Sequence, residues 1–234
     1  FEQYQFETSD LMSTYLFSFV VGEFKSSTKN VNNFPMTMLY RENNPEKISE
    51  STAPIFSLHR QSVSFLEKYT QHPFPFKKMD FATIPVFQYG GMEHVGAIQY
   101  RESKLFLDNS ATDSEKLSRG KLIAHEVSHM WFGDLVTMKW FNDVWMKEVF
   151  ANFMADKIMN PAFPDINHNL QFLTAHYSSA YDEDRTKGSH PIRQNLTNLK
   201  NAGSLYSSII YNKTPIIMRQ LESTMGKEVF QKGI

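Results

Sequence analysis

The chain has 234 residues, 41% of them hydrophobic, and a formal net charge of −1, which leaves no basic stripe for nucleic acid or an anionic lipid surface. It contains no apolar run of about eighteen residues, so none of it is expected to span a membrane. Without a single cysteine it forms no disulfide and performs no thiol chemistry, a composition compatible with the cytoplasm and the periplasm alike.

The first part of the chain predicts two units joined by a polar linker. Aromatic and other apolar side chains alternate over residues 15–22, as in a β-strand. The polar stretch 25–33 is predicted to be a linker, and after it we expect a strand near 34–42 and a helix near 53–70. The expected domains are residues 1–25 as the end of one domain, 26–33 as the linker, and 34–234 as a second domain.

Residues 84–107 predict a strand, a glycine-rich turn and another strand. The strands are expected at 84–87 and 98–107, on either side of Gly90 and Gly91. Hairpin chemistry alone explains an acidic residue such as Glu93 next to this turn. A binding role for Glu93 therefore depends on what lies around it.

The most informative feature is the motif His125-Glu126-Val127-Ser128-His129. Two histidines four positions apart on a helix differ by about 40° around its axis, so both imidazoles can hold one cation. Glu126 then lies beside that cation without binding it. The helix is predicted over about 113–132, with Thr112 and Glu115 as a capping box and a stop at Gly133.

Glu148, nineteen positions after His129, is the candidate third ligand. The next predicted helix, 144–159, is nearly all apolar, and a carboxylate buried there without a partner is costly. Three protein ligands and an open position are what zinc needs to do chemistry. The alternative, polar residues on a solvated helix face, is disfavoured by the apolar residues around the motif. Asn142 or Asp143 is expected to cap this helix.

Three segments, GGMEH (90–94), HEVSHMWFGDLVTMKWFNDVWMKEVFANF (125–153) and YNK (211–213), resemble the aminopeptidase N family of zinc metallopeptidases. MSTYLFSFVVGEF (12–24) is similar to the last strand of the family's N-terminal β domain. The resemblance covers essentially the whole chain. It implies an α+β fold: a thermolysin-like catalytic domain with a small mixed sheet plus helices, preceded by the end of a β domain and truncated at its C-terminus.

The resemblance implies one Zn²⁺ per chain, bound by His125, His129 and Glu148. It makes Glu126 the general base toward the attacking water. Asp143 is a candidate for orienting a ligand histidine, although helix capping explains it equally well.

The same resemblance assigns the substrate end of the site to residues 90–94. Glu93 would hold the free α-ammonium group of a peptide, and the segment Gly90, Gly91 and Met92 would let the substrate backbone approach. The strand that follows is expected to offer edge hydrogen bonds to an extended peptide. His94 stands where the family usually has Asn, which changes how the first peptide group is held.

The implied activity is a zinc aminopeptidase that removes N-terminal residues. Tyr211 would donate a hydrogen bond to the oxyanion, with Tyr206 as the alternative. His168 and His176 have no partner of convincing spacing and are expected at the surface. Two other hypotheses stay open: a zinc endopeptidase or leukotriene-hydrolase-like epoxide hydrolase, and a non-catalytic scaffold. The implied partners are peptides with a free N-terminus and further domains of the same polypeptide, and not nucleic acid.

Overall fold

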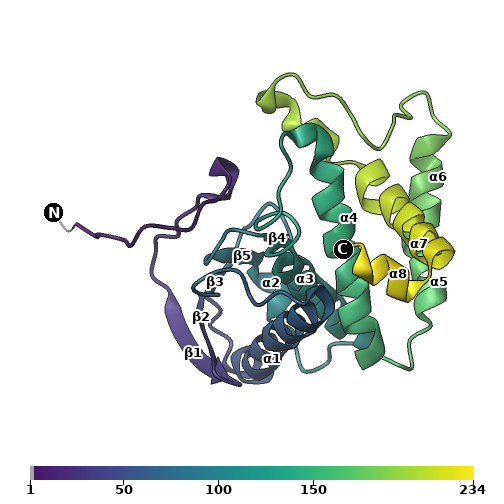
Figure 1. Cartoon of the computed structure of the whole chain (residues 1–234). Coiled ribbons are helices and arrows are strands. Elements are labelled where there is room, and N and C mark those ends of the chain that lie inside the picture. The colour runs from purple at the N-terminus through teal and green to yellow at the C-terminus, as the bar shows by residue number, and fades with distance from the viewer. Residues whose placement is uncertain (1–2) are drawn as a thin grey trace.

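A five-stranded mixed sheet lies beside a group of helices in the computed structural model, which describes residues 3–234 (Figure 1). This is the α+β arrangement predicted from the sequence. The strand order is β1-β2-β3-β5-β4, with β2, β3 and β5 parallel and the outer pairs antiparallel. The strands are β1 (Lys25–Val31), β2 (Phe34–Tyr40), β3 (Phe81–Ile84), β4 (Gly91–Met92) and β5 (Ile98–Arg101).

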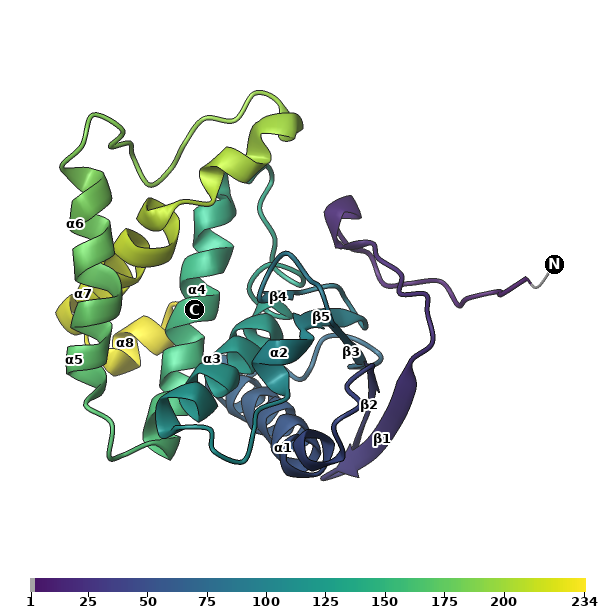
Figure 2. The ribbon, with the colours of Figure 1, turned by 180° about the vertical axis from the view of Figure 1, so that it is seen from behind.

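The helices α1 and α3 lie on one side of the sheet, α4 packs against α3, and α5 to α8 lie beyond α4 (Figure 2). None of the helices within residues 3–234 combines the length and apolarity needed to cross a membrane. The α-helices are α1 (Pro45–Thr70), α2 (Glu102–Leu105), α3 (Asp113–His129), α4 (Val144–Met159), α5 (His168–Phe172), α6 (Ser178–Asp184), α7 (Thr214–Met225) and α8 (Lys227–Lys232). Short 3₁₀ or π segments are Thr14–Leu16, Phe141–Asp143, Asn160–Ala162, Leu173–Tyr177, Leu199–Leu205 and Ile209–Lys213.

The strand and the linker predicted near the N-terminus were both wrong. Residues 17–24 form no strand and residues 14–16 form a 3₁₀ turn, whereas the supposed linker contains β1. Asn32 and Asn33 both have positive φ and join β1 to β2 as a two-residue hairpin turn. The polar composition of β1 fits an outer strand. The segment before it has no neighbouring strand among the described residues to complete a ladder.

Other boundaries also moved, for identifiable reasons. Helix α1 begins eight residues before the predicted start, because the Asn44 side chain caps it by accepting from two backbone N–H groups and Pro45 suits the first turn. The predicted hairpin of strands 84–87 and 98–107 is wrong, because β3 and β5 run parallel. The antiparallel partner of β5 is β4, so β4 is the edge strand in place of β5.

The two helices of the motif were predicted closely. The capping box of Thr112 and Glu115 starts α3, which ends at His129 and not at 132. Gly120 in the middle of α3 has a packing reason: a Cβ there would come within 2.6 Å of the Met159 sulfur on α4. The close approach of α3 to α4 therefore depends on this glycine.

A buried histidine ties α1 to the sheet. His59 stacks on Phe81 of β3 with ring centroids 4.1 Å apart, and it donates from Nδ1 to the carbonyl of Ile55. Its Nε2 accepts from the hydroxyl of Tyr100 on β5, at 3.0 Å. Burial lowers the pKa of His59 to about 4, so the ring is neutral near pH 7.

Candidate active site

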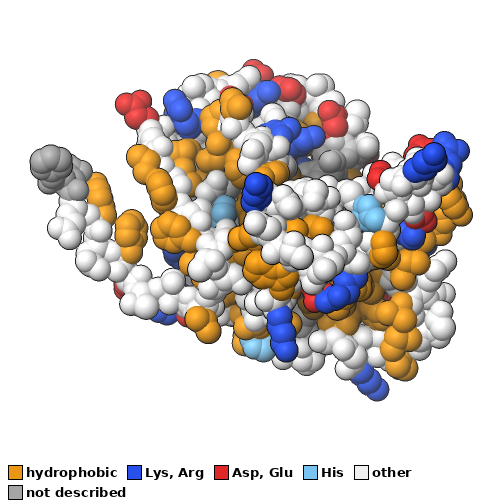
Figure 3. Space-filling model, turned by 90° about the horizontal axis from the view of Figure 1, so that it is seen from above, with side chains coloured by type: hydrophobic (Ala, Val, Ile, Leu, Met, Phe, Trp, Pro, Cys, Tyr) orange, Lys and Arg blue, Asp and Glu red, His pale blue; other side chains and the backbone are white. Residues whose placement is uncertain are grey.

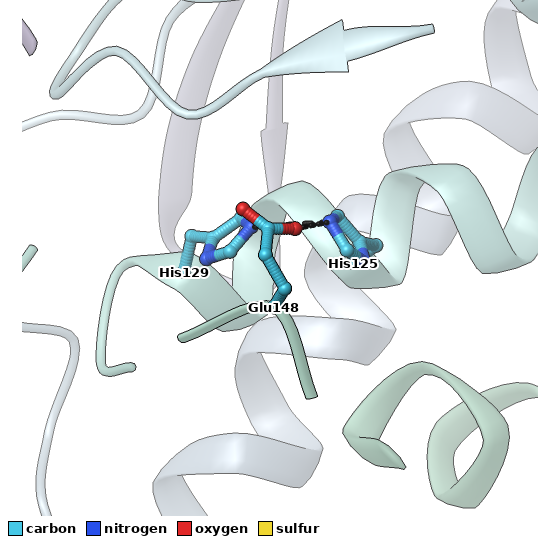
Figure 4. Close-up of side chains that lie close together, drawn as sticks. All are labelled: His125, His129 and Glu148. Carbon is cyan, nitrogen blue, oxygen red and sulfur yellow. Dashed lines mark hydrogen bonds and ion pairs between the residues drawn. The ribbon is translucent and has the colours of Figure 1, made fainter. Parts of the chain in front are cut away.

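His125, His129 and Glu148 bring one donor atom each to a common point (Figure 4). The two Nε2 atoms lie 3.1 Å apart, and Oε2 of Glu148 lies 3.4 Å from Nε2 of His125 and 3.8 Å from Nε2 of His129. Ligands of a tetrahedral zinc ion lie roughly 3.3–3.6 Å from one another. The spacing of these three donors therefore fits that ion.

Both histidines are oriented through their other ring nitrogen. Nδ1 of His125 donates to Oδ1 of Asn152 at 2.9 Å, and Nδ1 of His129 donates to the carbonyl of Phe132 at 3.1 Å. These hydrogen bonds occupy both Nδ1 atoms and leave both Nε2 atoms facing Glu148, the arrangement that metal-binding histidines use. Asn152 lies one turn after Glu148 on α4.

The charges at this point favour a cation. Burial raises the pKa of Glu126 to about 8, and the neighbouring carboxylates of Glu93 and Glu148 add to the shift. Burial would lower the pKa of His125, but its hydrogen bond to Glu148 and the charge of Glu126 raise it to about 9. Burial lowers the pKa of His129 to about 4. The charged carboxylates of Glu93 and Glu148 thus attract positive charge to the point where the Nε2 atoms meet.

A second set of donors, Glu93, Glu126 and His129, also converges within 4.8 Å. Glu93 is already paired, because the Lys147 ammonium donates to its Oε1. The first set contains two imidazoles, each oriented by a hydrogen bond from its Nδ1, and is the better candidate for a metal site. The Glu126 carboxylate lies directly against Gly91, where a Cβ would come within 2.3 Å of its Oε1.

Glu93 lies at the far end of β4 in a buried group of charges. Lys147, itself 6% exposed, bridges Glu93 and Oε1 of Glu148, the latter at 3.0 Å. Burial alone would raise the pKa of Glu93, but Lys147 lowers it to about 2, so this carboxylate is charged at neutral pH. The hydroxyl of Tyr15 also donates to Oε1 of Glu93, at 3.3 Å.

His94 turns toward the N-terminal segment. Its Nδ1 donates to the carbonyl of Leu16 at 3.0 Å, and its ring forms part of the cleft wall. The resemblance predicted a change in how the substrate's peptide group is held, and the hydrogen bond to Leu16 is an additional role that the sequence did not reveal. Burial lowers the pKa of His94.

Tyr211 and Tyr206 both line the cleft. They come from the segment that passes over the N-terminal end of α4 (Figure 2). Tyr211 lies in the π turn Ile209–Lys213, an irregularity that is frequent at functional sites. The two rings stack with centroids 6.2 Å apart. Burial raises the pKa of Tyr211, and it raises that of Tyr206 to about 12. Both phenols are protonated at neutral pH and can donate hydrogen bonds.

These groups line one cleft of about 1240 Å³. Every site residue predicted from the sequence contributes to its wall: Gly90, Gly91, Met92, Glu93, His94, His125, Glu126, His129, Glu148 and Tyr211. The cleft continues past the candidate metal ligands to an ion pair of Lys121 and Asp156, 2.7 Å apart, and to His176. The expectation that His176 is a surface residue was wrong, because Asn212 holds its half-buried ring at the cleft.

The capping role expected for Asn142 or Asp143 was also wrong. Neither side chain caps α4, since Asp143 pairs with Arg193 at 2.6 Å and Asn142 accepts from the backbone of Leu196. Both instead anchor the 193–196 segment above α4. Asp143 makes no hydrogen bond to a ligand histidine among the described residues; Asn152 has that position.

Three contributors were missed by sequence reasoning: Lys147, Asn152 and Tyr15. Lys147 and Asn152 left a signal, because each is a polar residue inside the apolar α4, beside Glu148 or one turn after it. Tyr15 left none, since 78 residues separate it from Glu93.

A helix carrying H-E-x-x-H, with a third glutamate from the next helix, defines a class of metal-dependent peptidases. The chain belongs to peptidase family M1, whose domain model matches residues 55–234. Members of this family depend on zinc in general. The α+β domain described above is accordingly the thermolysin-like catalytic domain that the sequence predicted.

Several curated proteins are similar to nearly the whole chain. Probable aminopeptidase 1 of Sulfurisphaera tokodaii is 35% identical over 99% of the chain and 29% of its own length. Leucyl aminopeptidase of Saccharolobus solfataricus is 33% identical, also over 99% of the chain and 29% of its own length. Endoplasmic reticulum aminopeptidase 2 of Homo sapiens is 34% identical over 98% of the chain and 24% of its own length. The chain thus spans less than a third of the length of these relatives.

Proposed function

We propose that the chain forms the catalytic part of a zinc aminopeptidase, which removes single residues from the N-terminus of peptides. The observation that carries this proposal is the position of Glu93, a charged carboxylate in the same cleft as His125, His129 and Glu148. An enzyme that cuts one residue from a chain end must recognise that end. A buried anion beside the metal ligands does so by pairing with the α-ammonium group.

His125, His129 and Glu148 would hold one Zn²⁺, supported by the spacing of their donor atoms and by the orientation of both imidazoles. When bound, zinc acidifies water and polarises the scissile carbonyl. Glu126 is the proposed general base: it lies beside the ligands, and burial holds its pKa near neutrality, where a group can both accept and return a proton.

Tyr211 is the proposed donor to the oxyanion. Its phenol stays protonated at neutral pH and lines the cleft near Glu148. One such donor typically contributes about 3 kcal/mol to stabilisation of the transition state. Tyr206, stacked on Tyr211, packs against the small apolar cluster at the start of α4, and we assign it to the cleft wall.

The proposed polypeptide contains further domains on both sides of this chain. The relatives are about three to four times longer, as their covered shares of 24–29% imply. Phe17, Phe19 and Val21 expose most of their side chains on an extended segment, as a strand would before it joins a sheet. Further toward the N-terminus, beyond the turn Thr14–Leu16, the described chain extends away from the body of the domain (Figure 3), and Tyr4, Phe6 and Leu11 are exposed there.

The test is cleavage of aminoacyl fluorogenic amides by the intact polypeptide, with and without a zinc chelator, alongside the N-acetylated amides. We expect activity that the chelator abolishes and that is confined to free amines. Equal cleavage of acetylated substrates would identify an endopeptidase. Stoichiometric zinc without cleavage of any amide would point to the epoxide-hydrolase chemistry, and the absence of zinc affinity to a scaffold.

A further inference from the structure

The N-terminal segment enters the proposed amine-binding site through one short turn. The 3₁₀ turn Thr14–Leu16 places Tyr15 in the wall of the cleft and buries Leu16, which is 1% exposed. The segments on either side of this turn form no regular element. The turn is therefore held by its own contacts with the domain.

Tyr15 contacts Glu93, Phe141 and Lys147. Its hydroxyl donates to Oε1 of Glu93 at 3.3 Å, and its ring packs edge-on against Phe141 with centroids 5.5 Å apart. The Lys147 ammonium lies 5.3 Å from the ring centroid, within reach of a cation–π interaction. Burial raises the pKa of Tyr15, so its hydroxyl remains a donor at any pH at which the enzyme would work.

Both donors to Glu93 use the same oxygen. Lys147 and Tyr15 each contact Oε1, and no group within residues 3–234 makes a hydrogen bond to Oε2. A carboxylate fixed through one oxygen presents the other in a defined direction. Oε2 is thereby left for an ammonium group entering from the cleft.

A second hydrogen bond holds the turn, from His94, the residue after Glu93. His94 donates from Nδ1 to the carbonyl of Leu16 at 3.0 Å. Two consecutive residues of the 90–94 segment thus bond to two consecutive residues of the turn, Glu93 to Tyr15 and His94 to Leu16. This double contact joins parts of the chain 78 residues apart.

We propose that Tyr15 is a positioning residue for the amine site: its hydroxyl fixes Oε1 of Glu93, and the bond from His94 to Leu16 holds the turn in place, so that Oε2 meets the substrate's α-ammonium group. This inference rests on the proposed function, because it assumes that Glu93 binds the amine. It gives the N-terminal segment a direct part in the choice of free N-termini.

The test compares two inhibitors of the zinc-loaded intact polypeptide: leucine hydroxamate, which has the α-amine, and its des-amino analogue. Tyr15→Phe keeps the ring and removes only the hydroxyl. We expect this variant to raise the inhibition constant of leucine hydroxamate roughly tenfold, within the range of a hydrogen bond to a charged group. The inhibition constant of the des-amino analogue should rise less than about twofold. For amide substrates, KM should rise with little change in kcat. The control is Tyr181→Phe, on the exposed face of α6.

The outcomes separate this inference from the proposed function. Glu93→Gln should abolish the preference for the amine-bearing hydroxamate. If it does and Tyr15→Phe leaves the preference intact, or weakens both inhibitors equally, the positioning role is overturned while the aminopeptidase proposal stands. If Glu93→Gln leaves the preference intact, both are overturned.

A second pair of variants tests the turn without altering Tyr15. His94→Leu removes the donor to Leu16 and should reduce the same preference, whereas His94→Asn retains an N–H donor and should restore most of it. Equal behaviour of the two variants would contradict the role given to this hydrogen bond.

Discussion

The two ends of the cleft are built in different ways. The metal end, His125, His129, Glu148 and Asn152, comes from two adjacent helices that pack closely because Gly120 has no side chain. The Nδ1 of each histidine makes one hydrogen bond, that of His125 to α4 and that of His129 to the backbone just after α3. This end is held mainly by the packing of α3 against α4.

The amine end, Glu93, Lys147 and Tyr15, comes from three segments that are distant in the sequence. It is held by charge: one ammonium group lies between two carboxylates, and a phenol completes the hydrogen bonds of one of them. Lys147 also contacts Glu148, so it belongs to both ends. Packing therefore sets the position of the proposed metal ligands, whereas charge balance sets the position of the proposed amine-binding group.

The largest expected effect comes from replacing Glu126, which should lower catalysis without lowering zinc binding. Glu126→Gln should reduce kcat roughly 10⁴-fold, about 5 kcal/mol, because an amide cannot act as a general base. Zinc content, measured by atomic absorption, should stay at one per chain. The exposed Glu50→Gln is the control and should change neither quantity. Loss of zinc from Glu126→Gln would show that this residue also supports the metal.

Lys147→Met should break the connection between the two ends. Removing one partner of a buried ion pair leaves carboxylates without compensation, which typically costs about 3–5 kcal/mol of stability. We expect a larger loss in the zinc-free protein than in the zinc-loaded one, since a dication offsets part of the same negative charge.

Chemical denaturation with and without a chelator measures both losses of stability. The exposed Lys139→Met serves as the control for loss of a surface charge. A loss of equal size in both metal states would mean that Lys147 acts on Glu93 alone.

Acid should weaken the sheet that supports the amine end through His59. Its pKa is about 4 in the folded protein and 6.5 when exposed, so between these values only the unfolded chain takes up the proton. This contribution to stability is complete above pH 6.5 and falls by up to about 3 kcal/mol as the pH drops toward 4.

The free energy of unfolding, measured by urea denaturation across this pH range, tests the contribution of His59. His59→Gln should lower stability at pH 7 and flatten the dependence on pH. An unchanged slope in that variant would assign the acid sensitivity to other groups.

The smallest of these effects concerns the orientation of a metal ligand. Asn152→Leu removes the acceptor for Nδ1 of His125 and should weaken zinc binding about 10–100-fold. Asn152→Asp retains an acceptor oxygen and should keep most of the affinity. Competition with a chelating dye gives both values. Similar affinities for the two variants would show that helix packing alone orients His125.

The same contrast explains how much could be predicted from the sequence. His125, Glu126 and His129 share one helix face, and the capping box of Thr112 starts that helix, so local rules were sufficient. Glu148 was identified because a charged residue in an apolar helix needs a partner. All the predicted site residues line one cleft, although their chemical roles remain predictions.

What could not be predicted depends on contacts between distant segments. Nothing near Tyr15 indicates that its hydroxyl meets Glu93, and the alternating pattern around it suggested a strand. The polar β1 was taken for a linker because an outer strand needs no apolar face. Asp143 was expected to cap α4, but Arg193, fifty residues later, takes its carboxylate.

If the proposed aminopeptidase activity holds, the edge strand β4 has a consequence for how a long peptide would move through the cleft. It is only two residues long and pairs with β5 on one side, which leaves its other edge beside the cleft. A peptide that added to this edge would form a very short ladder, limited to its first residues. Such a ladder is easily broken after each cut. We expect the shortened peptide to advance by one residue and pair with β4 again, because only a few backbone hydrogen bonds have to break.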